Sequence, residues 1–186
     1  MRNLIGGLIG AVLGSWLLII MMSAIQPAYP PEAAAIWPIL AGSHLLSQSL
    51  AQLLVPTTVL YYILIWLIIG VIISPFSRSL WNAVRTSIWT GVWTSIFAVI
   101  SILLLEPDFW NGATRNWDLV ILFASTTIIA LLALLSATPI VRLLEEIRKE
   151  TAQPLPEKIE TICECGAVFK SKPLLCSECG RKLSAD

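Results

Sequence analysis

The sequence predicts an all-α membrane protein, in which a bundle of four transmembrane helices is followed by a small module built on four cysteines. Three observations predict this fold. The 186-residue chain is 56% hydrophobic and only 13% charged, whereas soluble domains are about 45–50% apolar and about 25% charged. Its mean hydropathy is +0.80. The apolar residues fall into long uncharged runs, and every cysteine lies near the C-terminus.

Four apolar runs are long enough to cross a bilayer, whose hydrocarbon core requires about 20 apolar residues of helix. None of them contains Asp, Glu, Lys, Arg or His. We expect the spans at residues 4–25, 56–74, 87–105 and 119–138. The first run is longer than the roughly 7–15 apolar residues of a secretory signal peptide, and no clean A-x-A cleavage site follows it. We therefore expect it to be retained as an anchor.

The distribution of positive charge predicts the orientation of the bundle, because short loops rich in Lys and Arg remain cytoplasmic. These residues occur at Arg2, Arg78 and Arg85 and, in the largest number, in the C-terminal tail. Residues 26–55 contain none, and residues 106–118 contain only Arg115 beside three acidic residues. Both termini are therefore expected inside the cell, which requires an even number of spans. We expect a multipass protein of the prokaryotic plasma membrane.

Small residues recur along the first expected span. Gly6, Gly10 and Gly14 lie four residues apart on one face of a helix, where a second backbone can approach closely. We expect this face to pack against another helix of the same chain. Self-association into a homo-oligomer is the alternative.

The segment between the first two spans changes character at Ser43. Its first part is rich in proline, which disfavours a helix. From Ser43 leucines occupy one helical face, and polar residues including His44 occupy the other. We expect an amphipathic helix at 43–54 that lies in the membrane interface or caps the bundle. His44 is expected to be solvated.

The fourth span is followed by a juxtamembrane segment. Asp118 is expected to cap the N-terminus of this span, and Pro139 to end or kink it. Residues 140–159 are predicted to form a short amphipathic helix and a proline-containing linker. A separate module is expected at 160–186.

Four hydroxyl side chains lie on one face of the third expected span: Ser87, Thr90, Thr94 and Ser101. Two interpretations are open. The hydroxyls are a possible polar lining for a pore, in which they would replace part of a solute's hydration shell. Alternatively, they donate to their own backbone or to a neighbouring helix. Because the spans carry no ionisable group, ion-coupled transport and intramembrane catalysis are not expected.

The cysteines form two short pairs. Cys163 and Cys165 belong to C-x-C-G, and Cys176 and Cys179 belong to C-x-x-C-G. Two chelating pairs separated by a hairpin-length insert can place four thiolates at the corners of a tetrahedron, which suits zinc. A module of roughly 25 residues is too small for a hydrophobic core and needs a metal or disulfides. A reducing cytosol disfavours disulfides, and iron is a chemical alternative to zinc.

The stretch CECGAVF…LLCSECGRKL resembles the zinc-ribbon modules that many bacteria and archaea append to membrane proteins. Such ribbons carry C-x-x-C-G twice. Here Cys176, Cys179 and Gly180 match that spacing, whereas Cys163 lies one residue closer to Cys165 than the pattern has it. The resemblance implies a small rigid surface that binds a protein or, less often, nucleic acid.

These features predict a non-enzymatic membrane adaptor or accessory subunit. Four thiolates close the coordination shell of a metal, so no position remains for a substrate. Acidic residues offset the basic edge of the module, so a nucleic-acid partner is not expected. The expected partners are the lipid bilayer and a protein bound by the module. A small channel or transporter for an ion or neutral solute, regulated by the module, is the alternative.

Overall fold

The structure is a computed structural model that describes residues 1–23, 27–151, 161–170 and 173–183. These residues belong to two compact units, Met1–Ile147 and Arg148–Asp186. Parts of three sequence expectations lie outside the described residues: the end of the first span at 24–25, the linker at 152–159, and positions 160, 171–172 and 184–186 of the cysteine module.

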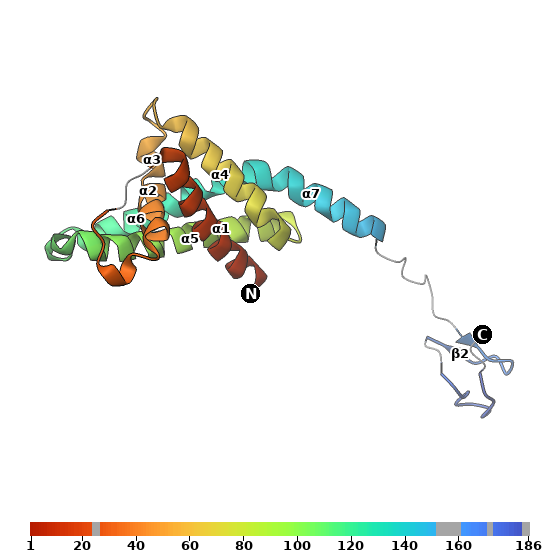
Figure 1. The fold of residues 1–186 in the computed structure, drawn as a ribbon. Coiled ribbons are helices and arrows are strands. Elements are labelled where there is room, and N and C mark those ends of the chain that lie inside the picture. Colours follow the sequence, from red (N-terminus) through yellow and green to blue (C-terminus); the bar gives the residue numbers. More distant parts are fainter. Residues whose placement is uncertain (24–26, 152–160, 171–172, 184–186) are drawn as a thin grey trace. The chain divides into compact units, whose positions relative to one another are not determined.

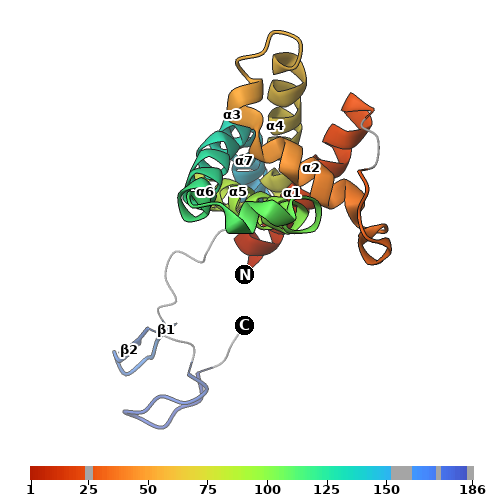
Figure 2. The same cartoon turned by 90° about the vertical axis from the view of Figure 1, so that its left-hand side faces the viewer.

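The first unit is helical (Figures 1 and 2). Its helices are α1 (Arg2–Met22), α2 (Trp37–Ser47), α3 (Ser49–Gln52), α4 (Val59–Ile73), α5 (Leu80–Leu105), α6 (Arg115–Ala130) and α7 (Leu134–Thr151). Short 3-10 turns, η1 (Pro31–Ala33), η2 (Ser74–Phe76), η3 (Pro107–Asn111) and η4 (Leu131–Ala133), connect or extend these helices.

Four helical segments are long and apolar enough to cross a membrane, as the sequence predicts. They are Arg2–Met22, Val59–Phe76, Leu80–Leu105 and Arg115–Arg148. The last segment is longer than expected because α6, η4 and α7 follow one another directly. Pro139 lies inside α7 and does not end it. Apolar helices in membranes tolerate proline, because neighbouring groups can re-satisfy the backbone carbonyl that proline leaves without a donor.

Helix α1 packs against α2, α4 and α5 through its glycines (Figures 1 and 2). A Cβ atom added to Gly7 would lie 2.6 Å from Cβ of Trp89 and 2.8 Å from the backbone nitrogen of Thr90 on α5. A Cβ atom added to Gly10 would lie 2.6 Å from Cγ2 of Ile73 on α4. Gly6 and Gly14 are also buried, the first against Phe76 and the second against Ile69. The glycine face of α1 therefore contacts helices of its own chain.

The segment between α1 and α4 begins its helix earlier than the sequence predicts. Helix α2 starts at Trp37 rather than at Ser43, and Pro38 lies in its first turn. Proline is tolerated there because the N–H groups of a first turn have no partner within the helix. The helix therefore extends into the proline-rich part of the segment, where proline is expected to disfavour it.

Helix α2 is packed into the bundle, against α1 and α5. Gly42 lies directly on the backbone of Ser15, and the hydroxyls of Ser15 and Ser43 share a hydrogen bond of 2.7 Å. His44, expected to be solvated, is half-buried, and its Nδ1 atom has no partner among the described residues. Leu54 is exposed after α3 has ended. The expected single amphipathic helix at 43–54 is thus replaced by a deeper α2 and a one-turn α3.

The N-terminus of α6 also differs from the expectation. Thr114, not Asp118, occupies the N-cap position, and its hydroxyl donates to Oδ2 of Asp118 at 2.8 Å. Asp118 lies in the first turn, where a carboxylate interacts favourably with the positive end of the helix dipole. Because the helix begins at Arg115, Asp118 lies within its first turn and not before it as predicted.

Replacing Gly7 with valine will destabilise the first unit. Its added carbons would overlap the backbone of α5, and such overpacking costs about 1–3 kcal/mol. We expect a lower midpoint of thermal unfolding for Gly7→Val in detergent micelles. Leu13→Val is the control, because Leu13 is exposed on the same helix. Equal midpoints for the two variants would contradict the close packing of α1 on α5.

Candidate functional site

Residues 161–170 and 173–183 of the second unit are called the cysteine module below. Strands β1 (Thr161–Ile162) and β2 (Val168–Phe169) pair antiparallel, with Ile162 opposite Val168. A second loop is closed by an antiparallel bridge between Leu175 and Lys182. Each loop carries one cysteine pair, so two short hairpins provide the four sulfur atoms.

The first loop folds tightly around Cys163 and Cys165. The Cys163 amide donates to the Ala167 carbonyl at 2.9 Å, and the Gly166 amide donates to the Cys163 carbonyl at 2.9 Å. Gly166 has a φ of +89°, a conformation that side chains with a Cβ rarely adopt. The glycine therefore closes the turn directly after the second cysteine of the pair.

The second loop repeats this arrangement with one more residue. The Cys176 amide donates to the Arg181 carbonyl at 2.8 Å, and the Gly180 amide donates to the Cys176 carbonyl at 2.9 Å. Gly180 has a φ of +69°. The extra residue of C-x-x-C thus lengthens the hydrogen-bonded turn from four residues, 163–166, to five, 176–180, and a glycine closes both turns.

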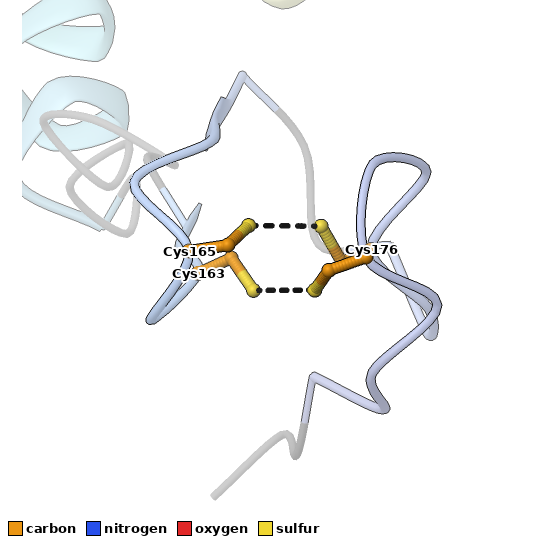
Figure 3. A group of neighbouring side chains, drawn as sticks. Cys163, Cys165 and Cys176 are labelled. Carbon is orange, nitrogen blue, oxygen red and sulfur yellow. Dashed lines mark hydrogen bonds between the residues drawn. The ribbon is translucent and has the colours of Figure 1, made fainter.

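The four sulfur atoms come together between the loops. Figure 3 shows the side chains of the two loops facing one another. Sγ of Cys163 lies 3.5 Å from Sγ of Cys179, and Sγ of Cys165 lies 3.6 Å from Sγ of Cys176. All four atoms lie within 4.8 Å of one another. Ligands at about 2.3 Å from a tetrahedral metal ion would be separated by roughly 3.8 Å, whereas a disulfide needs about 2.05 Å. The cluster could therefore hold a metal ion.

Backbone amides point at the sulfur atoms and shift their acidity. The Cys179 amide donates to the sulfur of Cys176 and, helped by the Glu178 amide, lowers the pKa of Cys176 to about 7 despite burial. The Ala167 amide donates to the sulfur of Cys165, but the neighbouring sulfurs outweigh this bond and raise the pKa of Cys165 to about 12. Each amide stabilises negative charge on the sulfur that it contacts, as ligation to a metal requires.

The two loops differ little in how they shield the cluster. The first cysteine of each pair, Cys163 or Cys176, is buried, and the second, Cys165 or Cys179, is exposed. An ion pair between Arg181 and Glu164 joins the loops at the surface. Sequence reasoning missed this pair, although Glu164 lies between the cysteines of its loop and Arg181 lies two residues after Cys179. Because both side chains are exposed, it contributes little stability.

The four hydroxyl residues of α5 with a possible role as a polar lining are buried inside the first unit. Thr90 donates its hydroxyl to the Thr86 carbonyl at 3.0 Å, and Thr94 donates to the Thr90 carbonyl at 2.9 Å. The hydroxyl of Ser101 bonds to that of Tyr29 at 2.6 Å. Ser87 Oγ has no partner within the part of the chain that the structure describes. Most of these hydroxyls are thus already satisfied by protein groups.

The purified full-length chain is expected to carry about one transition-metal ion, measured by inductively coupled plasma mass spectrometry. Cys176→Ser will lose most of this metal, because a serine hydroxyl does not replace a soft thiolate ligand. Ser177→Ala is the matched control in the same loop and will retain it. A metal-free wild type, or full metal content in Cys176→Ser, would exclude the site.

Zinc affinity is expected to fall as the pH falls, because protons compete for the thiolates. In the metal-free site Cys165, with a pKa of about 12, is protonated throughout the neutral range. Cys176, with a pKa of about 7, gains its proton as the pH falls from 8 to 6. Below its pKa, Cys176 releases one additional proton when the metal binds. The slope of log affinity against pH will therefore be steeper by about one at pH 6 than at pH 8. Competition with a chelator of known pH dependence measures it; a constant slope would contradict the lowered pKa of Cys176.

Comparison with known proteins does not assign the chain to a family. No protein-family model matches it, and no curated protein or solved structure shows significant similarity to it. Its function must therefore be inferred from the chemistry of the cysteine cluster and from the surface of the module that carries this cluster.

Proposed function

We propose that this protein is a non-enzymatic membrane adaptor or accessory subunit, whose zinc-bound cysteine module docks a protein partner in the cytoplasm. Zinc is the proposed ion because it favours a tetrahedral set of four thiolates and undergoes no redox change. A closed set of four sulfur ligands supports a structural role for the ion, since no ligand position remains for a substrate.

The exposed aliphatic surface of the cysteine module carries this proposal. Ile162 is 68% exposed, Val168 59%, Leu174 82% and Leu175 54%. Ile162 and Val168 are directly opposite in the β1–β2 pair, so their side chains lie on the same face. Exposed apolar patches are typical of surfaces that bind other proteins. A rigid module that leaves its large aliphatic residues in water is suited to docking.

The arrangement of charge in the first unit supports a cytoplasmic position for both ends of the chain. Arg2 and Arg78 line one cavity where α1 begins and α4 ends. Glu106, Asp108 and Asp118 belong to the connection and first turn after α5, at the other end of that helix. Since Lys and Arg favour the cytoplasmic side, the proposed location is a prokaryotic plasma membrane with both termini inside.

Affinity capture of the tagged full-length protein tests the docking role. Val168→Asn is expected to lower the yield of the main co-purifying protein by at least about tenfold, as substitutions at binding hot spots do. Its metal content should be unchanged, because Val168 is not a ligand. Lys170→Asn is the control, since Lys170 is exposed in the same hairpin.

A partner that is retained equally by both variants would contradict docking through the aliphatic surface. Solute flux through liposomes that contain only this protein, with loss of flux in Thr94→Val, would instead support the channel or transporter. The adaptor proposal expects Thr94→Val to behave as wild type, because the hydroxyl of Thr94 already bonds to its own helix.

A further inference from the structure

A cavity of about 280 Å³ lies where α1 begins and where η2 leads from α4 into α5. It is lined by Met1, Arg2, Asn3, Phe76, Arg78 and Asn82. This volume is near the lower limit of ligand pockets in proteins. It suits a small polar group and not a whole lipid or nucleotide.

Long-range contacts hold the walls of this cavity in place. The side-chain amide of Asn3 donates from Nδ2 to Oδ1 of Asn82 at 3.2 Å, and this bond joins α1 to α5. The Arg2 guanidinium donates to the Pro75 carbonyl at 3.3 Å, which joins α1 to η2. Phe76 packs against Gly6. The cavity is therefore part of the folded bundle and not a gap between loose loops.

The positive charge of the cavity is not balanced by the protein. No acidic residue lines it, and the sequence has no Asp or Glu in residues 1–31 or 33–105. Among the described residues, the bonding partner of Arg2 is a neutral carbonyl. Arg78 has no ion-pair or hydrogen-bond partner within the described part of the chain. Two guanidinium groups beside two side-chain amides match the donors that bind phosphate oxygens.

Helix dipoles add to this preference for an anion. Both α1 and α5 begin at the cavity, and neither has an acidic residue in its first turn. Among the described helices, α4 alone, through η2, brings its negative end to the same place. The partial charges of the two N-termini therefore outweigh that of the single C-terminus.

The surface beside the cavity is apolar and exposed. Leu4 and Ile5 follow Asn3 on α1, and Leu80 and Trp81 precede Asn82 on α5; all four side chains are exposed, Trp81 by 62%. The Arg85 guanidinium lies over the Trp81 ring, 5.4 Å from its centroid. Exposed Trp and Arg side chains at the end of a membrane helix are typical of the headgroup level. A ligand with a phosphate and an apolar tail would meet both surfaces.

We propose that this cavity binds the phosphate group of an anionic phospholipid. Arg2 and Arg78 bind the phosphate oxygens, Asn3 and Asn82 fix the position of the headgroup, and the acyl chains lie along the apolar surfaces of α1 and α5. The lipid would brace the junction of α1, η2 and α5. This inference requires the bundle to sit in a bilayer but is independent of docking by the cysteine module.

Native mass spectrometry of the detergent-solubilised full-length chain tests this site. With equal amounts of phosphatidylglycerol and phosphatidylcholine, the protein should retain phosphatidylglycerol with roughly tenfold preference. Arg78→Gln and Arg2→Gln should each lower this retention about tenfold. Arg142→Gln, which removes an exposed positive charge from α7, is the matched control and should change it less than about twofold.

Three results would overturn the proposal. Equal loss in Arg142→Gln and Arg78→Gln would show a diffuse charge effect in place of a site. Equal retention of the two lipids would show that the anionic headgroup is not recognised. Displacement of phosphatidylglycerol by inorganic phosphate would show a site for a soluble anion. Arg78 is exposed and has no partner among the described residues, so its replacement should leave the unfolding midpoint of the lipid-free protein unchanged. Arg2→Gln provides a second variant if the midpoint changes.

Discussion

Close approach of helix backbones at small residues is the constraint on which the first unit depends. Apolar helices gain little from leaving lipid, because acyl chains are as apolar as leucine, so they associate through van der Waals contact. Gly7 places α1 against the backbone of α5, and Gly42 places α2 against Ser15 of α1. Larger side chains at these two positions would separate the helices and remove most of that contact.

Hydrogen bonds within α5 explain how this closely packed helix accommodates so many hydroxyl groups. Thr90 and Thr94 are fully buried and donate to carbonyls one turn earlier in the same helix. Bonds of this kind satisfy a hydroxyl without a partner from a neighbouring helix, so the methyl groups are free to pack. The Thr90 methyl group lies beside Gly10, 3.3 Å from where a Cβ atom of that residue would be. The polar pattern of α5 is therefore consistent with helix packing.

The sequence was sufficient to predict the four apolar helices and the meeting of the four cysteines, because both depend on local hydropathy and spacing. It was not sufficient for the features that tertiary contacts decide. Helix α2 begins at Trp37 because its buried face extends from Pro38 to the Gly42 contact with Ser15, and no local signal marks that contact. The continuation of α7 through Pro139 is likewise not marked by a local signal in the sequence.

The short C-x-C spacing of the first loop does not move its sulfur atoms away from those of the second loop. In both loops a glycine with positive φ follows the second cysteine, and the amide two residues beyond that cysteine donates to its sulfur. Only the closing turn differs, by one residue. The second cysteine and its glycine therefore fix the direction of each loop, while the residues before them adjust. Because the sulfur pairs across the loops are nearly equal, at 3.5 and 3.6 Å, the missing residue is compatible with a closed four-sulfur site.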